Sequence, residues 1–325
     1  DIGFTGIDFG WVSNVTVSGN TLTNLFDNGM QIVDAASGVI ISNNTITNAN
    51  TALVAGQGGI KLFGSPASLT ITGNTISGSV NGFAVEPGND LTGKAIAVNN
   101  NNFAGNSGYG INHLGTGTLD ANCNWYGSND PTTVATKVTI RVDYTPWLNA
   151  GTDISTDPGF QGDFSHLWVD DNSPQTGSAG RIQEGINLVS GSTVNVAEGT
   201  YNETVQIGKA VTLSGAGKTQ TIIQPTVGLS TGVGHKYDAN MTVAMFVNNT
   251  TGVTIKDMTI DGNELGLNAV LFWNASSGTL QNVKVMRPSA FSGMQTGQGL
   301  AVDATSPGST DLTVDNCEFE QWNKN

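Results

Sequence analysis

The residues of this sequence that could carry acid–base chemistry are few and widely spaced. Charged residues make up 12% of the 325-residue chain, which contains 3 histidines. His113, His166 and His235 share no regular spacing, so the sequence does not predict a histidine metal site. Lys61 and Glu86 would suit a base and its partner if they lie on neighbouring strands, which are about 4.8 Å apart. The alternative is a surface ion pair, which we favour for these two residues.

A second chemical motif, Gly217-Lys218-Thr219, has the residue types of a phosphate-binding loop. That loop also needs a glycine five positions before Gly217, where this chain has Thr212. Nucleotide binding is therefore not predicted, because a turn between strands explains the glycines.

A third candidate is the aspartate-rich segment 149–179, where Asp, Pro, Gly and Ser interrupt any periodic pattern. We interpret it as a linker. Clustered aspartates suit calcium, whose ligands are oxygens, but the segment lacks an Asp-x-Asp-x-Asp-Gly loop. We therefore expect a solvated loop and no cofactor, with calcium as the alternative.

The elements that must position these residues come from a repeat. Five segments share one template: apolar, any, apolar, any, any, Asn, any, apolar. The template asparagines are Asn20, Asn44, Asn74, Asn101 and Asn124. They are 24, 30, 27 and 23 residues apart, and a short strand recurring at such a step indicates a solenoid.

The template also predicts which side chains face the core. Apolar residues two apart on a strand point to one face, so Val15 and Val17 should point inward, as should Ile41 and Ile71 in later copies. If the copies stack in register, the asparagines form an internal ladder that is bonded from coil to coil. A second strand follows in four copies, each led by a glycine, and its predicted outward row is Gln31, Lys61, Ala84 and Asn112.

These asparagine-rich coils resemble the right-handed parallel β-helix of the pectate-lyase-like superfamily. The resemblance implies an all-β solenoid made of two β-helical segments joined by a linker. It says little about function, since this fold hosts lyases, hydrolases, esterases, adhesins and inert stalks.

The order of the two segments is unusual. Asn124-Trp125-Tyr126-Gly127 and the later Tyr144-Thr145-Pro146-Trp147 resemble the ending of β-helical domains in large secreted bacterial proteins. From residue 180, a short helix, strands and a Gly199-Thr200-Tyr201 turn resemble the N-terminal cap and first coils of such a helix. We therefore predict that residues 1–148 are the C-terminal part of a β-helix with its closing cap. Residues 149–179 are the predicted linker, and 180–325 the cap helix and first coils of a second β-helix.

The closing segment supplies aromatic candidates for ligand binding. Trp125 and Trp147 would cover the last coil, whose edge would otherwise recruit other strands. The alternative is that an exposed tryptophan stacks on a sugar. The candidate glycan contacts are thus Lys61, Glu86, Trp125 and Trp147.

The resemblance also implies what an enzyme of this fold would need. Uronate lyases use a Lys or Arg base with carboxylates that hold calcium, and pectin methylesterases use paired Asp with Gln and Arg on central coils. The matching stretches here, 257–261 and 284–288, show no such set, and Arg287 has no evident acidic partner. We therefore predict no catalytic residues.

The net charge limits the classes of partner, and the positions of the cysteines bear on disulfide formation. The net charge of −14 argues against binding to nucleic-acid phosphates or an anionic membrane surface, and no apolar run approaches the ~20 residues that cross a bilayer. Cys123 and Cys317 belong to different segments, so free thiols are favoured over a bridge.

We expect an extracellular or cell-surface structural or adhesive β-helix, such as a stalk, adhesin or filament subunit. Its partners would be copies of itself or adjacent β-helical domains, stacked head to tail through uncapped coils near Asp1 and Asn325. The alternative is a polysaccharide lyase or hydrolase, or a non-catalytic glycan-binding module, with a polysaccharide as partner.

Overall fold

The computed structural model describes residues 5–33, 37–234, 240–265, 268–274, 276–287, 298–304 and 310–320. The predictions that concern Asp1, His235, Pro288 and Asn325 lie outside these residues. The chain divides into two compact units. Unit 1 comprises residues 1–164 with 173–177, and unit 2 comprises 165–172 with 178–325. The segment predicted as a linker, 149–179, is shared between the two.

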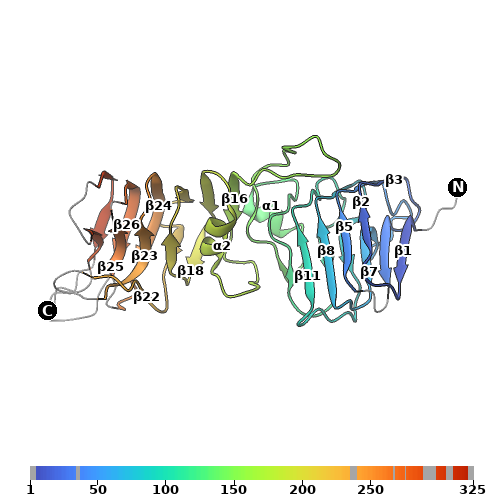
Figure 1. Cartoon of the computed structure of the whole chain (residues 1–325), viewed down its shortest axis with the longest axis horizontal. Helices are drawn as coiled ribbons and strands as arrows, with labels where there is room; N and C mark the ends of the chain where they lie inside the picture. The colour runs from blue at the N-terminus through green and yellow to red at the C-terminus, as the bar shows by residue number, and fades with distance from the viewer. Residues whose placement is uncertain are drawn as a thin grey trace. The chain divides into compact units, whose positions relative to one another are not determined.

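Unit 1 is built from three sheets whose strands stack along the solenoid (Figure 1). The first sheet runs β1 (Ile7–Gly10), β4 (Met30–Val33), β7 (Gly58–Phe63), β10 (Asn81–Val85) and β12 (Ile111–His113). The second runs β2 (Thr16–Ser18), β5 (Val39–Ser42), β8 (Ser68–Thr72), β11 (Ala95–Asn99), β13 (Leu119–Asp120) and β14 (Val142–Asp143). The third runs β3 (Thr21–Thr23), β6 (Thr45–Thr47) and β9 (Thr75–Ser77). The strand pairs of these sheets are parallel, which confirms the predicted β-helix.

The predicted inward rows of unit 1 are the core. Ile41 and Ile71, which pair in register across β5 and β8, have no exposed surface. Val17, in the outermost described coil, is half-buried because only one neighbouring coil covers it among the described residues. Gly29 and Gly110 lie directly before β4 and β12, where the backbone passes close to the core. An added Cβ would lie 2.6 Å from Ile46 in the first case and 2.8 Å from Tyr126 in the second. This close approach explains the recurring glycine.

The residue before each template asparagine bends the coil between two strands. All five of these residues have positive φ: Gly19 (70°), Asn43 (57°), Gly73 (68°), Asn100 (56°) and Cys123 (55°). Glycine and asparagine tolerate this conformation best, so the sequence alternates between them along the row. The buried Cys123 is the exception, and neither it nor the half-buried Cys317 forms a disulfide within the described residues.

The closing part of unit 1 contains β15 (Trp147–Leu148) and a short helix, α1 (Pro131–Ala135). Asp130 caps α1, because its side chain accepts the backbone N–H of Thr133 at 2.9 Å. Proline at the first helical position completes the start signal.

Unit 2 begins with β16 (His166–Val169) and the predicted cap helix, α2 (Arg181–Leu188). Helical spacing puts Ile182, Ile186 and Val189 on one face, and all three are buried. Its larger sheet continues with β17 (Thr193–Val196), β18 (Gly199–Tyr201), β20 (Thr212–Gly215), β21 (Thr221–Ile223), β24 (Val253–Asp261), β26 (Gly278–Met286), β28 (Leu312–Asp315) and β29 (Glu318–Glu320). The second sheet contains β19 (Val205–Ile207), β22 (Leu229–Ser230), β23 (Thr242–Asn248), β25 (Asn268–Trp273) and β27 (Leu300–Asp303).

The strands of unit 2 bend within their length. Asp257 in β24 and Asn282 in β26 have φ of 58° and 54°, so each of these nine-residue strands turns a corner in its middle. Before the corner β24 pairs with β20, and after it β24 pairs with β21, parallel in both cases. The outward-facing side chains of the second halves, which include Thr259 and Asp261, therefore lie on a separate outer face, while Met258 and Ile260 are fully buried.

Candidate functional site

The five template asparagines form a continuous hydrogen-bonded ladder through unit 1. Each side-chain Nδ2 donates to the Oδ1 of the next asparagine, at 3.0, 3.0, 2.9 and 3.1 Å from Asn20 through Asn124. The same Oδ1 atoms accept the backbone N–H groups at 2.8–3.0 Å. Asn44, Asn74, Asn101 and Asn124 are fully buried, whereas Asn20 is exposed. The ladder therefore satisfies buried polar groups and offers no ligand site along its inner rungs.

Unit 2 carries a different ladder. The inward positions that hold asparagine in unit 1 are occupied here by the apolar Met258 and Val283 and by the half-buried Cys317. The hydrogen-bonding side chains belong instead to the preceding residue, at the corner of the strand. There Asn316 Nδ2 donates to Asn282 Oδ1 at 3.1 Å, and Asn282 Nδ2 donates to Asp257 Oδ1 at 2.8 Å.

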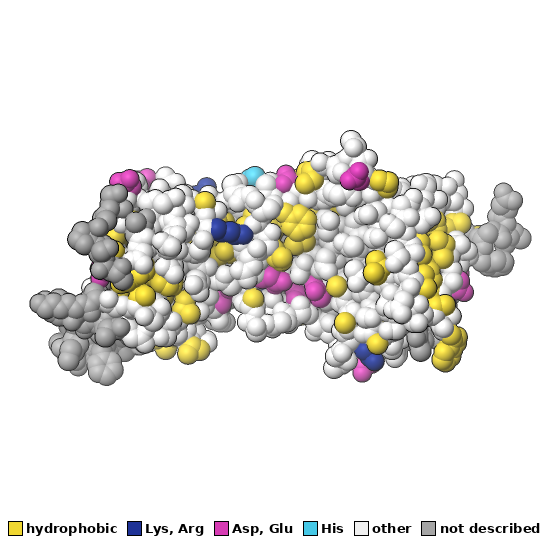
Figure 2. All heavy atoms as spheres, in the orientation of Figure 1, with side chains coloured by type: hydrophobic (Ala, Val, Ile, Leu, Met, Phe, Trp, Pro, Cys, Tyr) yellow, Lys and Arg dark blue, Asp and Glu magenta, His cyan; other side chains and the backbone are white. Residues whose placement is uncertain are grey.

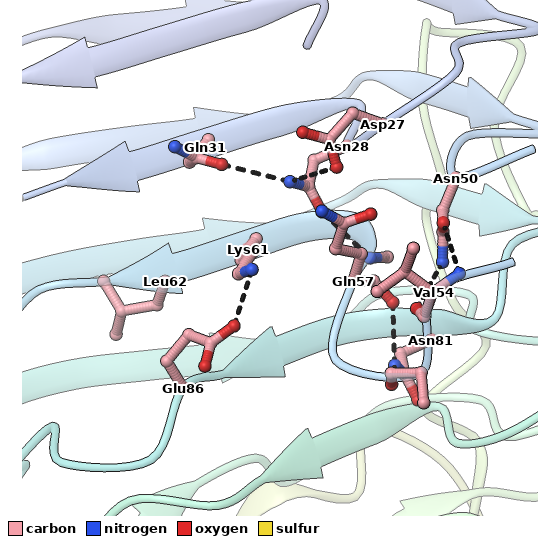
Figure 3. Close-up of polar contacts among 12 residues, drawn as sticks. Asp27, Asn28, Gln31, Asn50, Val54, Gln57, Lys61, Leu62, Asn81 and Glu86 are labelled. Carbon is pink, nitrogen blue, oxygen red and sulfur yellow. Dashed lines mark hydrogen bonds and ion pairs between the residues drawn. The ribbon is translucent and has the colours of Figure 1, made fainter. Parts of the chain in front are cut away.

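Lys61 and Glu86 meet on the outer face of the first sheet (Figure 3). Lys61 lies in β7 beside Ala84 of β10, and Glu86 follows β10 directly. Lys61 Nζ is 2.5 Å from Glu86 Oε1, and the two side chains are 10% and 24% exposed. The ammonium also lies 5.7 Å from the ring centroid of Phe63, which is half exposed. An ammonium donor and a carboxylate acceptor beside an aromatic ring suit the hydroxyls and C–H groups of a sugar.

Buried amides hold the surroundings of this pair. Asn28 is fully buried; its Nδ2 donates to Asp27 and Gln31 at 3.1 Å, and its Oδ1 accepts the N–H of Gly58 at 3.0 Å (Figure 3). The loop before β7 is fixed by Asn81, whose Nδ2 donates to the carbonyl of Gln57 at 2.7 Å. Buried hydrogen bonds therefore hold the backbone around the Lys61–Glu86 pair in place.

The two tryptophan candidates differ in exposure. Trp125 is half-buried. Trp147 has no exposed surface, and its ring centroid lies 5.8 Å from that of Tyr144. A ring without exposed surface has no face for a sugar, so Trp147 is corrected from a glycan contact to part of the cover over the last coil.

The expectation that Arg287 lacks an acidic partner was wrong. Arg287 follows β26 with φ of 45°, which turns its side chain back toward Asp261 at the end of β24. Its Nε donates to both carboxylate oxygens of Asp261, at 2.9 and 3.1 Å, and its terminal Nη2 contacts Oδ2 as well. Gln224 Nε2 donates to Oδ2 at 2.9 Å, and the N–H of Asn263 donates to Oδ1 at 2.9 Å. Asp261 is only 3% exposed.

This carboxylate lies in a pocket of about 340 Å³ on the outer face of unit 2. We name it the Asp261 pocket, and its lining residues are Thr200, Lys218, Thr219, Ile222, Gln224, Thr259, Asp261, Lys284 and Met286. The strand register explains the grouping. Ile222 pairs with Thr259, Thr259 with Lys284, and Asp261 with Met286.

The lysines of the pocket are paired with glutamates of β29. Lys218 Nζ lies 2.8 Å from Glu318 Oε1, and Lys284 Nζ lies 2.8 Å from Glu320 Oε2. Hydrogen bonding to Lys218 lowers the pKa of Glu318. The bond to Glu320 raises the pKa of Lys284, and the bond to Asp261 raises the pKa of Arg287.

A signal for this site was present in the sequence. Asp261 and Arg287 are separated by 26 residues, which is close to one coil step and to the spacing of 25 between Lys61 and Glu86. Charges spaced by one coil meet on neighbouring strands when both point outward.

The described ranges contain neither a metal-ligating cluster nor a membrane-spanning helix. No group of three or more His, Cys, Asp or Glu residues there is arranged to hold a metal ion. No helix in the same part of the chain has the length and apolar character needed to cross a membrane.

Comparison with known proteins supports the fold. Residues 3–94 match a family model described as a right handed beta helix region. The match covers part of unit 1, and the parallel coils of both units make the described chain a parallel β-solenoid. No curated protein and no solved structure matches the chain.

Proposed function

We propose that this chain is a structural and adhesive β-helix that works outside the cell or at the cell surface and assembles end to end. The observation that carries the proposal is the outermost rung of the ladder. Asn20 donates to Asn44 just as Asn44, Asn74 and Asn101 each donate to the next asparagine. Its own Oδ1 accepts no hydrogen bond within the described residues, although the Oδ1 of each later asparagine accepts two.

The strands around Asn20 support the same proposal. Strands β1, β2 and β3 each pair on one side only among the described strands. Nearby Trp11 is 77% exposed, and Phe26 is 46% exposed. Unpaired backbone groups and exposed aromatic residues make an edge that recruits further strands. A coil of a second copy would add another rung to the ladder, and head-to-tail addition without closure generates a fibre.

Electron microscopy of the purified protein tests this proposal. We expect rods of increasing length as the protein concentration rises. Trp11→Lys should shorten them, because a lysine directly after the edge strand β1 opposes strand addition. Ile140→Lys is the control, since Ile140 is 84% exposed but lies in the closing part of unit 1.

Wild-type protein that stays monomeric at every concentration would contradict self-assembly. Rods formed only by a longer polypeptide would instead assign the edge to an adjacent β-helical domain. If both lysine variants shorten the rods equally, rod formation does not depend on the edge at Asn20.

The adhesive part of the proposal needs a ligand. The catalytic alternative requires a group that attacks or abstracts a proton, whereas Asp261 is engaged by Arg287, Gln224 and Asn263. The pocket therefore favours binding over turnover.

A further inference from the structure

We infer that the Asp261 pocket binds a neutral, hydroxyl-rich saccharide. The inference rests on the proposed adhesive role and names its ligand class. It concerns the outer face of unit 2 alone and is independent of the edge at Asn20.

The pocket contains a fixed set of polar groups. Asp261 is almost completely buried, and Arg287, Gln224 and Asn263 hold its carboxylate from different sides. The amide nitrogen of Gln224 is committed to Asp261, which fixes the side chain. Its carbonyl oxygen makes no hydrogen bond within the described residues and remains an acceptor for a ligand hydroxyl. Pre-fixed planar amides and guanidinium groups bind at a low entropic cost.

The basic residues around the pocket are balanced by acidic partners. Lys218 faces Glu318, Lys284 faces Glu320, and Arg287 faces Asp261, so the cations around the pocket are already paired. An anionic ligand would have to displace a carboxylate, and the chain as a whole carries a net charge of −14. Uncharged hydroxyls can donate to carboxylate or amide oxygens and accept from Lys or Arg without breaking these pairs.

The size and the apolar lining of the pocket also suit a sugar. Ile222 and Met286 line the pocket together with the hydroxyl-bearing Thr200 and Thr219. Sugar rings present C–H faces to apolar side chains and hydroxyls to polar ones. The volume of about 340 Å³ is at the lower end of small-molecule sites, which suits one or two sugar rings rather than a long segment.

The experiment is a calorimetric titration of the whole chain with neutral oligosaccharides of gluco, galacto and manno configuration, and with an oligogalacturonate. We expect at least one neutral series to bind and the oligogalacturonate to bind more weakly. Gln224→Ala should weaken binding about tenfold, the loss expected for a central polar contact. Thr200→Val removes a hydroxyl from the rim without changing side-chain shape and should also weaken it.

Gln281→Ala is the matched control. Gln281 also lies in unit 2 and also donates its Nε2 to an aspartate, Asp315, at 3.2 Å, but it does not line the pocket. Its affinity for the neutral saccharide should equal that of the wild type. Circular dichroism melting of each variant separates loss of binding from loss of fold.

Three results would overturn the inference: no neutral saccharide binds, the oligogalacturonate binds more tightly, or Gln281→Ala weakens binding as much as Gln224→Ala. The rods of the Gln224→Ala variant should match those of the wild type in electron micrographs. If the wild type forms rods but binds no saccharide, the proposed assembly stands and the proposed ligand is rejected. If it binds a saccharide but forms no rods, the ligand stands and the assembly is rejected.

Discussion

The side-chain amide of Asn74 donates to Oδ1 of Asn101 at 2.9 Å, and both residues are fully buried. Asn74 Nδ2 also reaches back to the carbonyl of Ile41 in the preceding coil at 2.9 Å. One side chain therefore connects three successive coils. This role explains why asparagine recurs although the spacing between copies varies: turns absorb insertions, while a rung requires an amide at a fixed place.

Asn74→Ala should lower the free energy of unfolding by about 1–3 kcal/mol, because it leaves buried backbone groups without partners. Denaturant unfolding of the purified protein measures the change. Asn20→Ala is the control, since Asn20 donates in the same way to the next asparagine but lies at an exposed rung. Its loss should be smaller, and an equal or larger loss would show that burial does not set the value of a rung.

Ile41→Asp should cost several kcal/mol and prevent unit 1 from folding at ordinary temperatures, because it buries an unpaired charge. Ile40→Asp changes the adjacent residue of the same strand, which is 41% exposed, and should be tolerated. Thermal melting followed by circular dichroism distinguishes the two. If both variants melt at the wild-type temperature, the inward assignment of this row fails.

Unit 1 was the easier part to predict because its template repeats five times. Ile41, Asn44 and the glycine before each second strand recur at fixed places in the repeat, so each copy supports the interpretation of the others. Unit 2 lacks this redundancy, since its inward row replaces asparagine with Met258, Val283 and Cys317.

Two other features escaped prediction for local reasons. Arg287 reaches Asp261 from a residue with positive φ, and the sequence does not reveal that backbone reversal. The aspartate-rich segment after residue 149 resembled a solvated linker, yet Phe160 within it is buried. Its N–H donates to the carbonyl of Gly73 at 2.7 Å, and both residues belong to unit 1. A single anchoring aromatic residue outweighs the polar composition around it.

Arg287→Gln should destabilise unit 2 strongly, by up to about 3–5 kcal/mol, because Asp261 would remain buried with its charge uncompensated. The double variant Asp261→Asn, Arg287→Gln should recover much of that loss, since neither group then carries a charge. A double-mutant cycle in denaturant measures the coupling. Additive losses would show that the two residues do not stabilise the fold as a pair.

The last prediction concerns Glu203, which caps helix α2 from a neighbouring loop. Its carboxylate accepts the N–H of Ile182 at 2.9 Å and that of Gln183 at 3.0 Å. Burial raises the pKa of Glu203 above its ordinary value of 4.5, and burial also raises the pKa of Asp170 in the same unit.

A raised carboxyl pKa means that the folded state holds a proton that the unfolded chain has already released. Stability should therefore fall as the pH rises from 4.5 through the raised pKa of Glu203 toward neutrality. Below 4.5 the lowered pKa of Glu318 acts in the opposite sense, and stability is lost again as its carboxylate is protonated. Glu203→Gln should flatten the upper part of this profile, while Glu198→Gln, at an exposed position, should leave it unchanged. Denaturant midpoints collected from about pH 4 to about pH 8, which runs from the ordinary carboxyl pKa to above neutrality, measure the effect. A wild-type midpoint that climbs steadily across this range, with the same slope in Glu203→Gln, would mean that the buried carboxyl does not control the stability of unit 2.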